Sequence, residues 1–158
     1  MRVGVISDTH GLLRPEAVDA LAGADLIIHG GDIGGPEILD RLRAIAPVVA
    51  VRGNNDHGPW ADALAETEIV VAAGARVYVI HDVKQIDVEP RAAGLAAVVA
   101  GHSHRPRCEE RDGVLWFNPG SAGPRRFSLP IAVGILHARG GRIRGEIVEL
   151  AVAAGRRG

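Results

Sequence analysis

Five short apolar runs, each ending abruptly at a polar side chain, constrain the fold more than any other feature of this sequence. The runs are VGVIS, ADLIIHGG, PVVAVRG, RVYVI and AAVVAG, and they are rich in valine and isoleucine without strict polar alternation. Runs of this length and composition are typical of strands that are buried on both faces. The sequence therefore predicts a sheet whose strands end in polar groups.

Two helical patterns separate the first three runs. Pro15 begins the first helix, which is expected to stop at Gly23, and Pro36 begins the second, whose apolar residues recur at helical spacing. Strands that alternate with helices indicate βαβ units. The front of the chain is thus expected to form a largely parallel sheet.

The second half of the chain carries hairpin signals instead of helical patterns. Turn pairs stand between strand-like runs at Ala73 and Gly74, at Asp112 and Gly113, and at residues 140–141. These turns predict a second sheet, rich in antiparallel strands, that packs on the first, with helices on the outer faces.

Length, charge and cysteine content narrow the class of protein. The 158 residues suit a single domain, and the hydrophobic fraction of 47% argues against disorder. A net charge of −1 gives no bulk attraction to nucleic acid or an anionic membrane. No membrane span or signal peptide is recognised, and Cys108 has no second thiol to pair with. We expect a cytoplasmic protein with one domain at residues 1–152 and a flexible tail at residues 153–158.

The strand ends carry the chemistry. Ligands of open α/β sheets bind outside the carboxyl ends of the strands, where polar side chains converge. Oxygen and imidazole donors together suit manganese, iron, nickel or zinc. Two four-coordinate ions would need one donor more than the runs supply, so one side chain must bridge, and the carboxylate of Asp32 can do so. The candidate ligands are Asp8, His10, Asp32, Asn54, His81, His102 and His104.

The motifs SDTHG, HGGD, GNND, a later His81 and GHSH stand in an order that resembles the calcineurin-like metallophosphoesterase family. The NPGSAGPRR stretch at residues 118–126 resembles its small, cap-less branch of YfcE- and MJ0936-like phosphodiesterases, whose fold is shared by the retromer subunit Vps29. The resemblance covers nearly the whole chain. It implies an α/β fold: a four-layer α/β/β/α sandwich of two mixed β-sheets flanked by helices, in a single domain without a cap.

The resemblance also implies a ligand set and a reaction. It implies a divalent-metal-dependent phosphodiesterase in which a metal-bound hydroxide attacks a small phosphodiester at a dinuclear centre. We expect two divalent ions, with manganese favoured and iron, nickel or zinc as alternatives, and we assign the catalytic roles to Asp32, Asn54 and His81. One ion is assigned to Asp8, His10, Asp32 and His104, and the other to Asp32, Asn54, His81 and His102.

Two positions depart from the family pattern. Many members place a histidine after the metal-binding asparagine, where it can protonate the leaving alkoxide, whereas this chain has Asn55. The branch commonly reads His-Gly-His around the ligand at position 81, whereas Asp82 and Val83 follow here. We expect poor leaving groups to react slowly and the substrate range to differ.

Several further residues have structural interpretations. His29 is expected in the core, His57 in a solvent-exposed loop, and His137 at a strand end without a catalytic role. Asp56 is expected to orient a ligand histidine or to cap a helix near Trp60. The remaining expectations concern Asn118 and Ser121, which would support the metal loops, and Arg125 and Arg126, which would face water or a substrate phosphate.

Three alternatives to the phosphodiesterase stay open. The same site would suit a phosphomonoesterase or a pyrophosphatase, and the fold could serve as a catalytically silent Vps29-like scaffold. Retention of all the candidate ligands argues against the scaffold. The near-neutral charge and five aromatic residues argue against nucleic acid as a partner, and an exposed edge of the hairpin sheet could support a homodimer.

Overall fold

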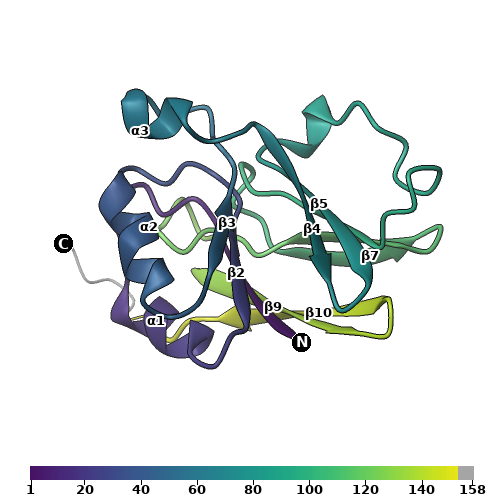
Figure 1. Cartoon of the computed structure of the whole chain (residues 1–158). Coiled ribbons are helices and arrows are strands. Elements are labelled where there is room, and N and C mark those ends of the chain that lie inside the picture. Colours follow the sequence, from purple (N-terminus) through teal and green to yellow (C-terminus); the bar gives the residue numbers. More distant parts are fainter. Residues whose placement is uncertain (153–158) are drawn as a thin grey trace.

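The structure is a computed structural model that describes residues 1–152, and its ten strands form two five-stranded sheets that pack face to face (Figure 1). The first sheet has the order β10-β9-β1-β2-β3 and the second the order β4-β5-β6-β8-β7. The strands of the first sheet are β1 (Arg2–Ile6), β2 (Leu26–His29), β3 (Val48–Ala50), β9 (Ala132–Arg139) and β10 (Arg142–Glu149). Those of the second are β4 (Thr67–Ala72), β5 (Ala75–Ile80), β6 (Ala97–Val99), β7 (Arg107–Arg111) and β8 (Val114–Asn118).

The helices lie mainly on one side of this sandwich. Helices α1 (Pro15–Leu21) and α2 (Pro36–Arg43) cover the outer face of the first sheet, opposite the second sheet (Figure 1). Both begin at the proline that the sequence indicated. Two shorter elements, α3 (Pro59–Asp62) and the 3-10 helix η1 (Val83–Gln85), follow β3 and β5. The helices thus anchor the β1-β2-β3 unit, which is parallel throughout.

All three predicted hairpins form, but the last one joins the first sheet. Strand β9 pairs antiparallel with β1, and β10 forms the edge. The apolar run in β9 is buried on both faces over residues 132–136, which suits a central position, whereas exposed residues alternate along β10 as an edge strand requires. The second sheet is not dominated by antiparallel pairs, because the fully buried β6 inserts in parallel between β5 and β8.

The four-layer sandwich of two mixed sheets is confirmed, and its fourth layer is thin. The main core lies between the sheets, where Val5 and Ile28 of the first sheet meet Val79 and Phe117 of the second. On the outer face of the second sheet, Tyr78, Val98 and Leu95 form a smaller cluster that is covered by Val83 and Ile86 from the η1 segment. A single helical turn with its flanking loop therefore takes the place of a full helix on that side.

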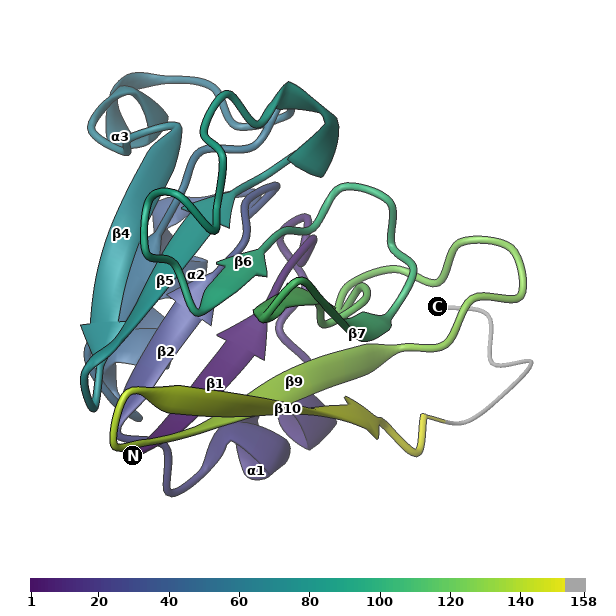
Figure 2. The ribbon, with the colours of Figure 1, turned by 90° about the vertical axis from the view of Figure 1, so that its right-hand side faces the viewer.

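The topology brings the carboxyl ends of five strands to one end of the molecule. Figure 2 shows the heads of β1, β2 and β6 pointing the same way, so the loops that follow them meet there. Within residues 1–152, no helix is long and apolar enough to cross a membrane. The predicted tail at residues 153–158 lies outside the described residues.

Candidate metal centre

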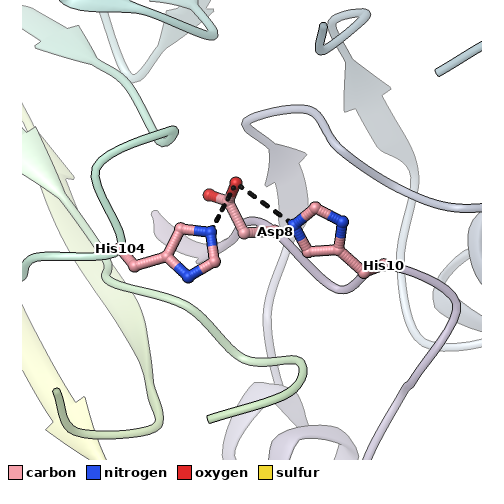
Figure 3. A group of neighbouring side chains, drawn as sticks. All are labelled: Asp8, His10 and His104. Carbon is pink, nitrogen blue, oxygen red and sulfur yellow. Dashed lines mark ion pairs between the residues drawn. The ribbon is translucent and has the colours of Figure 1, made fainter. Parts of the chain in front are cut away.

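Asp8, His10 and His104 form one group of potential metal ligands at this end of the molecule. One donor atom from each lies within 4.8 Å of the others. The rings of His10 and His104 flank the carboxylate of Asp8 from opposite sides (Figure 3), with their Nε2 atoms 3.9 and 3.3 Å from its Oδ1 atom. The loops after β1 and β6 therefore converge on one carboxylate.

A second group consists of Asp32, His81 and His102, whose donor atoms also lie within 4.8 Å of one another. The side chain of Asn54 belongs to the same cluster. Its Oδ1 atom is 3.0 Å from Nε2 of His81 and 3.2 Å from Nδ1 of His102. The loops after β2, β3, β5 and β6 supply these four side chains, so every predicted ligand lies in one of the two groups.

Asp32 connects the two groups. Its Oδ2 atom is 3.3 Å from Nε2 of His81 in the second group and 3.8 Å from Nε2 of His10, which belongs to the first. Adjacent donor atoms bound at about 2.0–2.2 Å around one ion are separated by roughly 2.8–3.6 Å in octahedral or tetrahedral geometry. The spacing between the donors is thus close to that of metal-ligand shells.

The backbone of the ligand loops is strained in a consistent way. Asp8, His10, Asp32, His102 and His104 all have positive φ, between 47° and 69°, and they are five of the eight non-glycine residues with positive φ in the part of the chain that the structure describes. Residues other than glycine rarely adopt this backbone conformation. Those that do are found mostly at functional sites, where the surrounding structure enforces it. The strain is therefore concentrated on the candidate ligands.

Neighbouring groups hold the ligands in place. The Ser7 hydroxyl donates to Oδ2 of Asp8 at 2.7 Å, and the backbone and side-chain amides of Asn55 donate to the two oxygens of Asp32 at 2.9 and 3.1 Å. Nδ1 of His81 lies 2.7 Å from the carbonyl oxygen of Gly30. A proton on Nδ1 that is donated to this carbonyl leaves the lone pair of Nε2, which faces Asp32 and Asn54, free to bind a metal ion.

Sequence reasoning did not identify the supporting roles of Ser7 and Asn55. The serine precedes the first ligand within SDTHG and the asparagine follows Asn54 in GNND, so adjacency to a ligand was the available signal.

Gly53 lies where the backbone approaches Asp32 closely. A Cβ atom at this position would lie 2.2 Å from Oδ1 of Asp32. A larger residue at that position would displace the bridging carboxylate.

The electrostatics favour anionic carboxylates at this site. Burial alone would raise the pKa of Asp32, but the neighbouring His81 ring and the backbone amide of Asn55 outweigh burial and hold the pKa well below its usual range. Burial likewise opposes ionisation of Asp8, and the neighbouring His104 ring and the Ser7 hydroxyl lower its pKa overall. For His81, burial acts to lower the pKa, but Asp32 and the Gly30 carbonyl raise it. The site thus attracts positive charge.

Buried polar atoms that lack a hydrogen-bond partner indicate whether these residues could bind a metal ion. Among residues 1–152, the buried side-chain atoms without a hydrogen-bond partner are Oδ1 of Asp8, Nε2 of His10 and Nδ1 of His104. All belong to the first ligand group. Buried polar atoms are rarely left unpaired, and the binding of a metal ion is one of the recognised explanations. With their oxygen and imidazole donors, the two groups therefore fit divalent metal ions.

The expectations for the NPGS turn agree with the structure. The side-chain amide of Asn118 donates to the carbonyl oxygen of Gly101 at 2.9 Å and to the Ser103 hydroxyl at 3.2 Å. The Ser121 hydroxyl donates to the backbone carbonyl of Asp8 at 3.1 Å. The turn thus supports the loops that carry His102, His104 and Asp8.

The two roles expected for Asp56 are wrong. Its buried carboxylate accepts hydrogen bonds from the backbone amides of Ile33, Gly34 and Gly53, at 2.9, 3.1 and 2.9 Å. Helix α3 begins after Gly58, without a side-chain cap. Asp56 therefore ties together the loops after β2 and β3, because three backbone donors there need a buried acceptor.

The remaining histidines lie as expected. His29 is fully buried, with Nε2 3.0 Å from the Thr9 hydroxyl and Nδ1 accepting from the Gly31 amide, and burial lowers its pKa from 6.5 to about 4. His57 is exposed. His137 lies on β9, 3.1 Å from Glu146 of β10. Both Arg125 and Arg126 are exposed, and Arg125 donates to a backbone carbonyl of its own loop.

A cavity of about 660 Å³ opens beside the second ligand group, and Asn54, His81 and His102 form part of its wall. Carboxylates outnumber cationic side chains in its lining. The acidic residues are Asp56, Asp62, Glu66, Asp82 and Asp87, against the single arginine Arg52, which is paired with Glu66 at 3.1 Å. A ligand in this cavity would contact the candidate metal centre under a largely negative potential.

The two-sheet sandwich with its clustered aspartate, histidine and asparagine side chains agrees with the metallophosphoesterases to which the chain is similar. Residues 1–141 match the calcineurin-like phosphoesterase superfamily domain, and the chain belongs to this family. It is 34% identical to a probable metallophosphoesterase of Methanothermobacter thermautotrophicus over 161 residues, covering 94% of this chain and 92% of the relative. It is 26% identical to the phosphodiesterase YfcE of Escherichia coli, covering 86% of this chain and 87% of YfcE.

Solved structures agree on the fold. The YfcE phosphoesterase of E. coli superposes with a TM-score of 0.69 at 26% identity, covering 87% of this chain and 88% of that one. Wild-type Vps29 of Entamoeba histolytica gives a TM-score of 0.73 at 24% identity, covering 94% and 99%. The second similarity concerns the fold alone.

Proposed function

We propose that the chain is a divalent-metal-dependent phosphodiesterase that hydrolyses small phosphodiesters at a dinuclear centre. The observation that carries this proposal is the position of Asp32, whose Oδ2 atom faces both ligand groups at 3.3 and 3.8 Å. A carboxylate between two groups of donors suits a bridging ligand. The similarity to YfcE, which is named a phosphodiesterase, supports the same reaction class.

The proposed ligand assignment follows from the two groups. Two divalent ions held by these groups would supply a lowered pKa for water at the site and positive charge opposite the phosphoryl oxygens of the substrate. Asp8, His10 and His104 would hold one ion and Asn54, His81 and His102 the other, with Asp32 shared. In this arrangement Asn54 and His81 border the 660 Å³ cavity, Asp32 lies 3.3 Å from His81, and we propose the catalytic roles for these three residues.

The chain's own residues determine which bonds break readily. Asn55 uses its backbone and side-chain amides to position Asp32 and carries no ionisable proton for a leaving alkoxide. Activated leaving groups such as aryl oxides, which depart without protonation, should therefore react much faster than alkyl oxides. His57 borders the same cavity but is exposed to solvent, and we assign it no role in the proton transfer.

The charge of the cavity favours diesters over monoesters. A phosphodiester has one negative charge near neutral pH, whereas a monoester approaches two. Carboxylates such as Asp62, Asp82 and Asp87 border the space beside the second ligand group, and they would oppose the second charge more strongly. A monoesterase or pyrophosphatase with the same ligands is therefore the less favoured alternative.

Further parts of the proposal concern the metal, the location and the assembly. We propose manganese as the native ion, because mixed carboxylate and imidazole donors accept it, with iron, nickel and zinc as competitors. We also propose a cytoplasmic protein. A homodimer is supported by the edge strand β4, where Ile69 and Val71 are 52% and 63% exposed.

The proposal is tested by hydrolysis of bis(4-nitrophenyl) phosphate and of 4-nitrophenyl phosphate, each with Mn²⁺ and with a chelator. We expect chelator-sensitive turnover of the diester that exceeds turnover of the monoester. Faster turnover of the monoester would show that the protein is a phosphomonoesterase and not a phosphodiesterase. No turnover of either substrate with any of the four metals would favour a Vps29-like scaffold.

A further inference from the structure

A second cavity, of about 630 Å³, lies on the other side of His102 from the acidic one. We call it the Trp116 cavity. It opens between the η1 segment and the β7–β8 hairpin, and the loop of Gly101, His102 and Ser103 forms one end of its wall. His102 and Asp82 border both cavities, so this pair separates them. The Trp116 cavity therefore adjoins the candidate metal centre at His102, a proposed ligand.

The lining of the Trp116 cavity differs in chemistry from that of the acidic cavity. Most of the wall is apolar, and the charged side chains of Lys84, Arg105 and Asp82 stand with it. Arg107, the third cation, is engaged by Glu109 at 3.0 Å and by the face of the Trp116 ring at 5.5 Å. The apolar residues are Val83, Val98, Ala100, Pro106, Trp116 and Phe117.

Val83 is one of the residues that form the apolar wall of the Trp116 cavity. It stands two residues after the proposed ligand His81 and packs on the apolar cluster of the second sheet. Its side chain therefore forms part of an apolar wall beside the site. An apolar wall close to a phosphate-binding centre suits an organic substituent of the substrate better than a further charged group.

We propose that the Trp116 cavity binds an apolar substituent, aryl or alkyl, of a phosphodiester whose phosphate lies at the metal centre. This inference rests on the proposed function and specifies its substrate class. Burial of the substituent against Val83, Trp116 and neighbouring residues provides the affinity.

The first test compares two competitive inhibitors of bis(4-nitrophenyl) phosphate hydrolysis in the Mn²⁺-loaded protein. Diphenyl phosphate and dimethyl phosphate carry the same anionic group and differ in their substituents. We expect diphenyl phosphate to bind at least about tenfold more tightly. The variants Trp116→Ala and Val83→Gln should remove most of this preference and raise KM with little change in kcat.

Gln85→Ala is the matched control, since Gln85 lies in the same short helix as Val83 but borders the acidic cavity. It should keep the preference for diphenyl phosphate. An equal loss in the Gln85 variant, or an unchanged preference in the Trp116 variant, would contradict the proposal.

The second test does not depend on catalysis. In a Trp60→Phe background, Trp116 is the sole tryptophan, and diphenyl phosphate should change its fluorescence at concentrations where dimethyl phosphate does not. If bis(4-nitrophenyl) phosphate is not hydrolysed but this response persists, the proposed reaction fails and the binding site stands. If the diester is hydrolysed but the response is absent, the reaction stands and the cavity proposal is wrong.

Discussion

Oδ2 of Asp32 lies 3.3 Å from Nε2 of His81. The same oxygen is 3.8 Å from a ring nitrogen of the other ligand group, so a single atom faces both. The residue has a left-handed backbone with φ of 56°, and its carboxylate receives two hydrogen bonds from Asn55. The fold thus fixes the orientation of this carboxylate before any ion binds, as a bridging ligand requires.

The two histidines of the GHSH motif should control different metal ions. His104→Gln removes a ligand beside Asp8, whereas His102→Gln removes one beside Asn54. We expect each variant to bind one Mn²⁺ ion fewer in calorimetric titration and to lose more than about 100-fold in diester turnover. His137→Gln, on β9, is the control and should match the wild type. Two ions retained by both GHSH variants would show that the assignment is wrong.

Asp56 should be important for stability rather than for metal binding. Asp56→Ala leaves three backbone amides without their acceptor, in a place where the side chain is 4% exposed. We expect the free energy of unfolding in urea to fall by about 3–5 kcal/mol. Asp62→Ala removes an exposed carboxylate nearby and should change the free energy of unfolding by less than about 0.5 kcal/mol. Similar losses in the two variants would contradict this role.

His29 should make stability depend on pH. Burial lowers its pKa from 6.5 to about 4, so between these values the unfolded chain binds a proton that the folded chain does not. Above pH 6.5 His29 is therefore neutral in both states and does not lower the free energy of unfolding. As the pH falls from 6.5 toward 4, the free energy of unfolding declines. From pH 7 to pH 5 the loss should be about 2 kcal/mol.

The check is urea unfolding of the chelator-treated wild type and of His29→Gln at both pH values. The variant lacks the titrating group, so its stability should fall by about 2 kcal/mol less than that of the wild type over this interval. Equal pH dependence in the two proteins would exclude His29 as the cause.

Much of the site could be predicted because its residues stand at strand ends. Parallel strands place their carboxyl ends at one edge, so runs that end in Asp8, Asp32 or Asn54 imply convergence without knowledge of distant contacts. The role of Asp56 could not be found in this way. Two of its three partners are backbone amides of another loop, and backbone donors leave no pattern in the sequence.

The sheet assignments show a similar limit. The turn pairs indicated the hairpins, because local turn chemistry specifies them. They did not indicate that β9 would pair with β1, since that pairing depends on burial of both faces of β9 against elements from the other end of the chain. The separate cavity beside Val83 was likewise hidden, because its walls come from the η1 segment and the β7–β8 hairpin.

The most direct test of the account is the metal content and activity of Asp32→Ala. Manganese bound per chain would be measured by mass spectrometry after gel filtration, together with bis(4-nitrophenyl) phosphate turnover and circular dichroism. We predict two ions and chelator-sensitive turnover in the wild type, and loss of both ions and of turnover in a folded variant. A folded Asp32→Ala protein that kept two Mn²⁺ ions and normal activity would contradict the bridging role on which the proposed function depends.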